Sequence, residues 1–533
     1  MPTVTKWGMG LSRLKLESAR KRFRNAMAIA PQDRFLRMLW AVNALRAGHT
    51  EAAARLIQFS PEQAKQAFGD THAIFPWELE TLAVQSFLTP RHIVQRFYKC
   101  EDFATAATFT NMLRQLENQD FGAKSEANQI QIFNEMHRIG QRQFPWQRGG
   151  VNLADFYRPL YLYGQGRCAE YFAAAHGLTV SDFALVGFAL FAMFSSSPYA
   201  VRPPNLSDME LTRDIVEAGL KLLMIPLSGA GAAQRALVAE TGAANWPIAY
   251  QPSILRRFPV LGVGGRPERL TAPLPILVLQ RVTFELYYDL MAGGGELRNE
   301  IAKRFEQYSA DFIRAMMPAF EVEAEYRYAG KRKGAAFDSP DILVDHDGAL
   351  AVVIECKATK LTISAKFADD PATEAGTRYA EIGRGVFQLW RFFAHTRMGL
   401  TGRTLTDTTA GIVLTLDTWL VMAQTLRDHV LEVANALADT DTDIIPVDRR
   451  PITFAAIQDF ERLLSQADET GVQAVLAAAH EDRFLGWLLP GVNQELSGPG
   501  KMKRKGYPFR PDELLPWWIK FDGDADDQEH KEP

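Results

Sequence analysis

Cysteine is scarce in this 533-residue chain, which contains only Cys100, Cys168 and Cys356. Three widely spaced thiols exclude a disulfide framework and a four-cysteine zinc site, and this usage suits a reducing compartment such as the cytosol. The ten histidines are dispersed, with no HExxH sequence, so zinc chemistry is not expected. A Walker A motif and a Gly-x-Ser-x-Gly elbow are also missing, which argues against ATP hydrolysis and against an α/β-hydrolase.

Neither sign of charge dominates, because 59 Lys and Arg residues stand against 63 Asp and Glu residues, a net charge of −4. This balance excludes a uniformly basic nucleic-acid-binding coat but leaves room for a local basic groove. With 47% hydrophobic and 23% charged residues, the composition is that of a globular protein. At roughly 150 residues per domain, the length predicts about three or four domains.

Long hydrophobic runs are absent as well. The most apolar stretch, 183–194, is short of the roughly 20 residues that a membrane span needs, and it predicts a buried helix capped by Ser181 or Asp182. Residues 1–24 contain basic side chains but no apolar core of a signal peptide. We therefore expect a soluble cytoplasmic protein without membrane contact.

The amino-acid composition and the hydrophobic pattern change along the chain. Residues 10–140 are poor in Gly and Pro and predict helices, 144–150 look like a boundary, and 151–285 are mostly helical with a turn at the glycines 262–265. From 286 onward, apolar β-type runs alternate with helical segments, which indicates an α/β domain. The predicted fold class is multidomain, α plus α/β, and the predicted domains are 1–145 (helical), 146–285 (mostly helical), 286–470 (α/β) and 471–533 (an extension with a disordered acidic tail).

The α/β part is predicted in more detail. Helices are expected at 297–317, 373–395, 419–437 and 453–466, and strands at 321–328, 342–344, 349–354, 411–416 and 444–447. Asp347-Gly348 is a strong hairpin-turn signal between the second and third strands. The glycines at 293–295 are expected to mark a helix boundary.

The two strands of this hairpin carry the candidate catalytic and metal-binding side chains. Asp341 opens the first strand, and the second ends in Glu355-Cys356-Lys357. Side chains alternate along a strand, so Glu355 and Lys357 should share one face while Cys356 points to the other. Two carboxylates held close attract a hard divalent cation, and a paired ammonium can orient water or stabilise developing negative charge. This combination suits phosphodiester hydrolysis, and Asp345 is the rival metal ligand.

Pro340-Asp341 followed fourteen positions later by Glu355-x-Lys357 resembles the PD-(D/E)xK nuclease superfamily, over residues 286–470 only. The resemblance implies a restriction-endonuclease-like domain with a central mixed sheet flanked by helices, and Mg²⁺ as cofactor, with Mn²⁺ able to substitute. The implied metal ligands are Asp341, Glu355 and the Cys356 backbone carbonyl, with Lys357 positioning the attacking water. Glu306 matches an acidic residue on the preceding helix, where it would hold a second metal or an outer-shell water. Gln388 matches a glutamine on the following helix, where it would tie down a ligand or contact phosphate.

Basic side chains near this segment are candidates for holding phosphates. They are Lys331, Arg332 and Lys333 between the first two strands, and Lys360 and Lys366 after the third. The basic cluster 501–505, with Trp517 and Trp518, either clamps a nucleic-acid strand or covers the domain.

The predicted function is a Mg²⁺-dependent nuclease acting on DNA more readily than on RNA. A role in restriction or anti-phage defence is suggested only by the architecture, and the helical half would bind substrate, a partner protein or a second copy. Three alternatives stay open: an inactive nuclease-fold protein that binds nucleic acid or acts as a scaffold, an interaction protein that works through its helical half, and a phosphoesterase acting on nucleotides.

Overall fold

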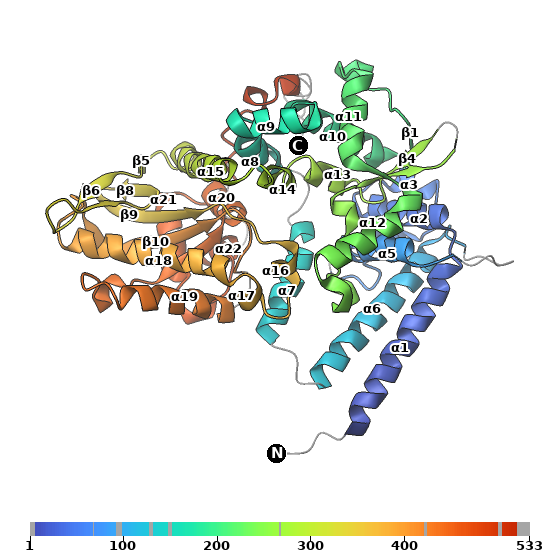
Figure 1. Ribbon diagram of the computed structural model, residues 1–533, viewed down its shortest axis with the longest axis horizontal. Coiled ribbons are helices and arrows are strands. Elements are labelled where there is room, and N and C mark those ends of the chain that lie inside the picture. The colour runs from blue at the N-terminus through green and yellow to red at the C-terminus, as the bar shows by residue number, and fades with distance from the viewer. Residues whose placement is uncertain are drawn as a thin grey trace.

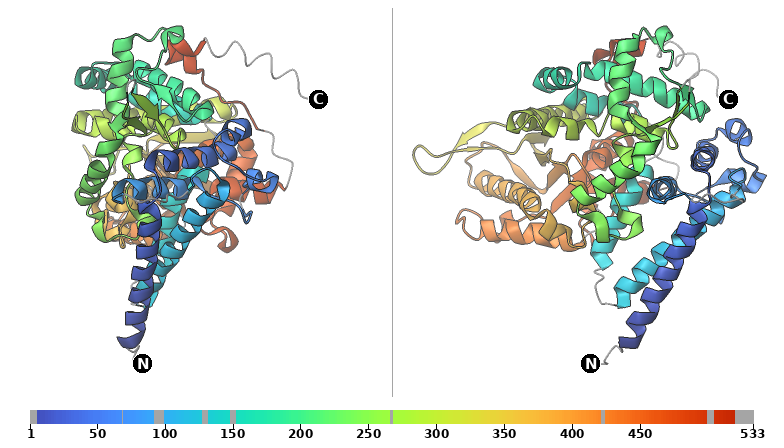
Figure 2. Two further views of the ribbon diagram at one scale, coloured as in Figure 1. Left: turned by 90° about the vertical axis from the view of Figure 1, so that its right-hand side faces the viewer. Right: turned by 45° about the vertical axis from the view of Figure 1, so that its right-hand side comes forward.

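The computed structural model describes residues 6–67, 69–91, 99–126, 132–147, 152–265, 268–420, 424–498 and 504–519. Its first part is helical, as predicted (Figure 1). The long helices α1 and α6 lie side by side and extend away from the rest of the molecule (Figure 2). The helices of this part are α1 (Lys6–Ala28), α2 (Gln32–Arg46), α3 (Thr50–Ala54), α4 (Pro61–Lys65), α5 (Pro76–Leu88), α6 (Phe103–Glu126) and α7 (Ile132–Gln147).

The expected sequence break at 144–150 does not end α7 where the pattern suggests, because the helix continues through Pro145 to Gln147. Beyond it lie α8 (Leu153–Tyr163), α9 (Gly166–His176) and α10 (Val180–Ser196). The predicted buried helix is α10, and its cap is Thr179 rather than Ser181 or Asp182, since the Thr179 hydroxyl accepts a hydrogen bond from the Asp182 amide.

The second region also contains a small sheet that the sequence did not predict. Its order is β1-β4-β3-β2, and its strands have only two to four residues, too few to show a periodicity. The expected turn after Gly262 joins β3 to β4. The strands are β1 (Ala200–Val201), β2 (Met224–Pro226), β3 (Val260–Val263) and β4 (Arg269–Thr271), and the accompanying helices are α11 (Arg213–Leu223), α12 (Leu227–Glu240), α13 (Ile276–Arg281) and α14 (Leu286–Met291).

The α/β part is built on a five-stranded mixed sheet of order β11-β10-β9-β8-β5. β5 and β8 are antiparallel, as are β8 and β9, whereas β9, β10 and β11 are parallel. The Asp347-Gly348 turn is confirmed, because both residues have the positive φ (54° and 79°) of a two-residue hairpin loop. The strands are β5 (Glu321–Ala324), β8 (Ile342–His346), β9 (Ala349–Lys357), β10 (Leu405–Thr415) and β11 (Ile452–Ala456).

Helices cover both faces of this sheet, as Figure 1 shows. Ile342, Ile354 and Cys356 belong to the core shared with α15 (Gly295–Met316), α20 (Ile457–Gln466) and α21 (Glu469–Ala478). Leu343 and Val353 point to the opposite face, into the core of α18 (Gly376–Arg397) and α19 (Gln424–Ala438). The α plus α/β class is therefore confirmed, and the glycines at 293–295 form the expected boundary between α14 and α15.

Two strand predictions are wrong. The segment 444–447 is not a strand: Pro446, which has no N–H for a sheet ladder, begins a 3₁₀ turn, Pro446–Asp448. The last strand is β11, whose residues the sequence assigned to the start of a helix, because a short apolar run fits either element. The strand expected at 321–328 is also divided into β5 and β6 (Arg327–Ala329), and β6 pairs with β7 (Ala336–Asp338) in a separate ribbon.

The C-terminal segment packs back on the second region. After α22 (Leu489–Ser497), Trp517 and Trp518 lie 5.3–6.2 Å, between ring centroids, from Phe156 and Phe188. The Lys505 ammonium donates to the Met316 carbonyl at 2.7 Å. These contacts favour the covering role for the aromatic pair. Residues 501–503 and the tail expected to be disordered lie outside the described residues.

Within the described part of the chain, no single helix has the length and apolar character to cross a membrane. α9 and α10 meet that test only as a pair, bent by 69°.

One hydrophobic core includes residues from Phe156 to Leu515 and joins the second region to the α/β part. A separate core lies among the first helices and includes residues as far along the chain as Leu277.

Candidate active site on the β8–β9 hairpin

Asp341 and Glu355 face each other across two antiparallel strands. Ile342 pairs with Ile354, so one further step of the register places Asp341 opposite Glu355. Directly opposed residues share a face of the sheet, which brings the two carboxylates together. The Cys356 amide donates a 2.6 Å hydrogen bond to Asp341 Oδ2, which holds that carboxylate against β9. The register and this hydrogen bond support the predicted acid pair.

Lys357 lies on the same face as Glu355, as strand alternation predicts. Its Nζ is 2.7 Å from Glu355 Oε1 and 3.5 Å from Gln388 Oε1. Burial alone would lower the pKa of this ammonium, but the nearby Glu355 and Asp341 carboxylates outweigh it and raise the pKa of Lys357 above its usual value. The side chain is 23% exposed, so a charged donor is held at an open edge of the site.

Helix α18 approaches this site closely because of Gly385. A Cβ at that position would lie 3.0 Å from Lys357 Cε and 3.2 Å from Glu355 Cγ. Gln388 is three positions further along the same helix and therefore on the same side, which explains how its amide reaches Lys357. Helix α18 thus leaves room for the side chains of Lys357 and Glu355 at Gly385, and it contributes one polar contact through Gln388.

Two more carboxylates surround this group. Burial raises the pKa of Glu306, on α15, to about 7, and the Asp341 and Glu325 carboxylates add to the effect. Glu325 was not predicted. Its backbone amide donates to the Asp341 carbonyl at 3.0 Å, and burial raises its pKa too. The available signal was the alternation Glu321, Glu323, Glu325, which brings one glutamate to the end of the strand beside Asp341.

The site carries more negative than positive charge. Burial raises the pKa of Asp341 to about 7, and repulsion from Glu355 contributes, which outweighs the Cys356 hydrogen bond and the Lys357 charge. Burial also raises the pKa of Glu355, a residue that is only 3% exposed. Glu355 Oε2 is buried and has no hydrogen-bond partner among the described residues. An unpaired buried carboxylate oxygen beside a second acid fits a bound cation.

The donor set suits a cation that keeps much of its water. The described residues contain no group of three or more His, Cys, Asp or Glu side chains placed to hold a metal ion. Mg²⁺ is commonly bound through one or two carboxylates, with water and substrate phosphate completing the shell. Asp341 and Glu355 would be those ligands. The Cys356 thiol faces the core on the other side of the sheet, so only its backbone carbonyl remains a predicted ligand.

The rival ligand Asp345 lies elsewhere. It is four residues further along β8, beyond a register shift, and its Oδ2 accepts from Arg403 at 2.9 Å. His346, beside the turn, packs its ring on Phe320 with 5.3 Å between ring centroids. The structure therefore groups Asp341 with Glu355 and Lys357, and leaves Asp345 in a separate ion pair.

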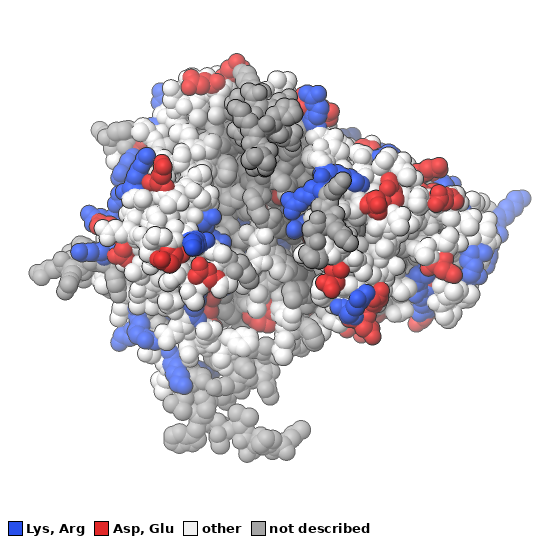
Figure 3. All heavy atoms as spheres, turned by 180° about the vertical axis from the view of Figure 1, so that it is seen from behind, with Lys and Arg blue, Asp and Glu red and all other residues white. Residues whose placement is uncertain are grey.

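The predicted phosphate-binding side chains are spread over several places. Lys331, Arg332 and Lys333 are exposed in the loop between β6 and β7, where Lys331 pairs with Asp443 at 2.7 Å. Tyr328 of this ribbon bonds to His395, ten residues beyond Gly385 on α18, so the ribbon packs roughly 15 Å along that helix from the site. On the face drawn in Figure 3, basic side chains are interspersed with acidic ones. The nucleic-acid role of this loop stays a prediction.

Lys360 and Lys366 are not on a solvated turn. Lys360 is half-buried, and its Nζ donates to the Phe284 carbonyl at 2.9 Å. Lys366 pairs with Asp417 at 3.0 Å. Both side chains line a cavity at the junction with the helical regions. The sequence suggested that both ammonium groups are free to meet phosphate beside the site, whereas each one already has a protein partner at this junction.

The chain was compared with models of known protein families, with curated proteins and with solved structures, and nothing matched in any of the three comparisons. The geometry of the site itself combines an acid pair, an ammonium and a surplus of carboxylates at the open end of a hairpin.

Proposed function

We propose that this protein is a metal-dependent nuclease of the PD-(D/E)xK type, with a domain of restriction-endonuclease-like fold. The observation that carries the proposal is the grouping of Asp341, Glu355 and Lys357 on one face of the β8–β9 hairpin, with a buried Glu355 oxygen left unpaired. The order α15, β5, β8, β9, α18, β10 supports the fold assignment, because it follows the helix, three strands, helix, strand order of that superfamily.

Each side chain then has a role that follows from its contacts. Asp341 and Glu355 would hold Mg²⁺, which when bound polarises a phosphoryl oxygen and lowers the pKa of its water. Lys357 would donate to the phosphate or the attacking water, because its ammonium is charged and partly open to solvent. Gln388 would fix the direction of Lys357, and Glu306 would hold an outer-shell water.

The choice of DNA over RNA is supported by the superfamily resemblance, and a role in restriction or anti-phage defence is suggested only by the architecture, a large helical half joined to this domain. The two helical regions would then select the substrate, a partner protein or a second copy of the chain.

The test is a cleavage assay of the full chain on supercoiled plasmid, linear duplex, single-stranded DNA and RNA, with Mg²⁺, Mn²⁺ or EDTA. We expect Mg²⁺-dependent scission that is lost in Asp341→Asn, Glu355→Gln and Lys357→Met. Glu321→Gln is the matched control, because this exposed carboxylate lies on the same sheet. Wild-type cleavage by all three site variants would reject the proposal.

A second candidate is a catalytically inactive nuclease-fold protein that binds nucleic acid or acts as a scaffold through its helical half. It is favoured by the lack of a third converging metal-ligating side chain in the described part of the chain. Binding to nucleic acid that survives EDTA, without scission of any substrate by the wild-type protein, would support this candidate instead.

A further inference from the structure

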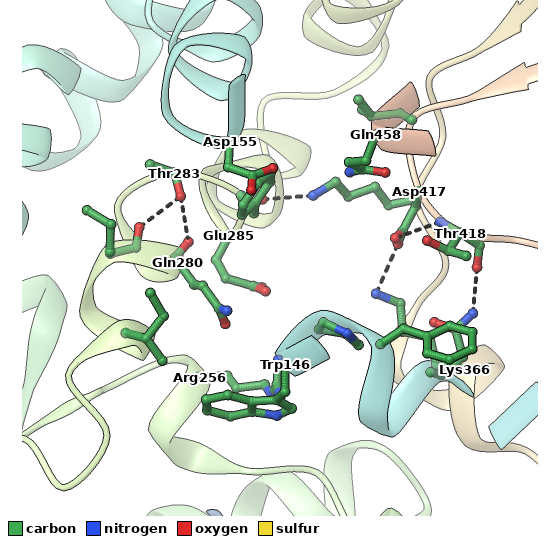
Figure 4. A pocket seen from close by; sticks show the side chains of 18 of the residues that line it. Trp146, Asp155, Arg256, Gln280, Thr283, Glu285, Lys366, Asp417, Thr418 and Gln458 are labelled. Carbon is green, nitrogen blue, oxygen red and sulfur yellow. Dashed lines mark hydrogen bonds and ion pairs between the residues drawn. The ribbon is translucent and has the colours of Figure 1, made fainter. Parts of the chain in front are cut away.

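A cavity of about 160 Å³ lies at the junction of three parts of the chain. Its walls come from α7, from the segment around α13 and α14, and from the loops that follow β9 and β10 (Figure 4). β9 and β10 are parallel and end together, at Lys357 and Thr415, and ligands of α/β proteins commonly bind outside such carboxyl ends. Leu416 lines the cavity, and its amide donates to the Lys357 carbonyl at 3.1 Å. This junction cavity therefore adjoins the backbone of the candidate active site.

The cations that line the junction cavity already have partners. Lys366 pairs with Asp417, and Arg256 makes two hydrogen bonds, of 2.9 and 2.8 Å, with Glu80. Lys360 donates to the Phe284 carbonyl, and burial lowers its pKa to about 8. A phosphate or polyphosphate would have to compete for each of these groups. The cavity consequently suits a ligand without net charge.

Two uncharged polar atoms of the lining, in contrast, are left over. The acceptor Gln458 Oε1 and the donor Trp146 Nε1 are buried and have no partner among the described residues. The Glu285 carboxylate lines the cavity, and in Figure 4 it lies between Gln280 and Thr283 on one side and Lys366 and Asp417 on the other. A buried acceptor without a partner is unfavourable, so a ligand that brings a donor to Gln458 Oε1 would stabilise this part of the lining.

Much of the apolar lining is aromatic. Phe144, Trp146, Phe284 and Tyr288 line the junction cavity, together with the aliphatic side chains of Ile276, Leu279 and Leu416. The Arg256 guanidinium lies 5.6 Å from the centroid of the Trp146 ring, which holds the indole in place. Aromatic walls favour a flat ring, and the volume suits a single ring system rather than a stretch of polymer. The occupant should therefore be planar, uncharged and able to donate hydrogen bonds.

We propose that the junction cavity binds a nucleobase that carries an exocyclic amino group, with Glu285 and Gln458 accepting from that group. Adenine, cytosine and guanine meet this description, whereas uracil and thymine have no amino group. The base has two potential sources: a free nucleoside or nucleotide, or a base of bound nucleic acid turned out of its stack. The chemistry at Glu285 is the same in both cases.

The test is calorimetric titration of the full chain in EDTA, so that no cleavage takes place. The probes are adenosine, cytidine, guanosine and uridine, and then single strands of dA, dC and dT of equal length. We expect at least one amino-bearing base to bind at least about tenfold more tightly than uridine or dT, which corresponds to roughly 1.4 kcal/mol. Binding of the nucleoside identifies a free ligand, and binding of the strand alone identifies a base of the polymer.

Glu285→Leu and Gln458→Leu should each weaken that binding by about tenfold or more, because they remove the acceptors. Glu240→Gln, an exposed carboxylate on α12 and remote from the cavity lining, is the matched control and should bind as the wild type does. Thermal unfolding verifies that each variant is folded. Equal binding of uridine, unchanged binding in both leucine variants, or no binding of any probe would overturn the proposal. Since EDTA removes cleavage from the assay, this result is independent of the nuclease test.

Discussion

A Cβ added to Gly385 would lie 3.0 Å from Lys357 Cε, so the side chain of Lys357 packs directly against the backbone of α18 at this glycine. Real Cβ contacts this short are uncommon, so Lys357 would have to move by a few tenths of an ångström. The backbone of Gly385 is ordinary helix, and its small size rather than its conformation is what the position uses.

Gly385→Ala should therefore reduce cleavage while leaving the fold intact. Alanine favours a helix interior over glycine by about 1 kcal/mol, so the free energy of unfolding should not fall by much, whereas the displaced Lys357 should lower the cleavage rate by about tenfold or more. Rates on plasmid and urea denaturation measure the two effects. Gly229→Ala on α12, where a Cβ meets nothing closer than 3.9 Å, is the control and should keep full activity. A fully active Gly385→Ala would show that the position of Lys357 is not critical.

Magnesium affinity should rise with pH through about 7. Burial holds the pKa of both Asp341 and Glu306 at about 7, so below that pH protons compete with the cation for carboxylate oxygens. Titrating Mg²⁺ into the full chain between pH 5.5 and 8.5 should show tighter binding at each step up to about pH 7.5 and little change above it. In Asp341→Asn both the affinity and most of this pH dependence should be lost. An affinity that does not change between pH 5.5 and 7 would contradict the assignment of Asp341 as a metal ligand with Glu306 beside it.

The free energy of unfolding of the metal-free protein, unlike its magnesium affinity, should fall as the pH rises. The folded-state pKa of Asp341 is raised above that of the unfolded chain, so the folded state binds more protons between pH 4 and 7 and loses stability as pH rises across that window. At pH 8 in EDTA, Asp341→Asn should unfold at a higher urea concentration than the wild type, by on the order of 1 kcal/mol, because it removes one of two facing charges. Adding Mg²⁺ should stabilise the wild type and not the variant. Lower stability of Asp341→Asn at pH 8 would mean that the acid pair is not strained.

Only part of the hairpin chemistry was predictable from local patterns. Strand alternation alone places Glu355 and Lys357 on one face. The Asp347-Gly348 turn by itself would place Asp341 opposite Ile354, and the register shift between Val344 and Asp345, which no local pattern announces, brings Asp341 across from Glu355. The contribution of Glu325 was not predicted: the alternation Glu321, Glu323, Glu325 shows which face of the strand it occupies, but its place beside Asp341 also depends on β5 pairing with β8, a contact between distant residues.

Other features that depend on contacts between distant parts of the chain were also not predicted from the sequence. Lys360 follows the site by three residues and was a candidate for holding phosphate, but its ammonium donates to the Phe284 carbonyl and lies 5.7 Å from the centroid of the Phe284 ring, at the junction with the helical regions. The four-stranded sheet of the second region has strands too short for any periodicity. β11 was assigned to a helix because its apolar residues run without a break into α20.

The second helical region and the α/β part should unfold together, because a buried ion pair joins them. Arg158 of α8, 1% exposed, pairs with Glu461 of α20, and Glu461 also accepts a 2.6 Å hydrogen bond from the Tyr308 hydroxyl of α15. Arg158→Ala should destabilise the protein by about 3–5 kcal/mol, since Glu461 would stay buried without its counter-charge. The double variant Arg158→Met with Glu461→Leu should recover much of that loss. Urea unfolding followed both by tryptophan fluorescence and by circular dichroism checks this: one shared transition is expected in the wild type, and two separate transitions would show that the regions unfold independently.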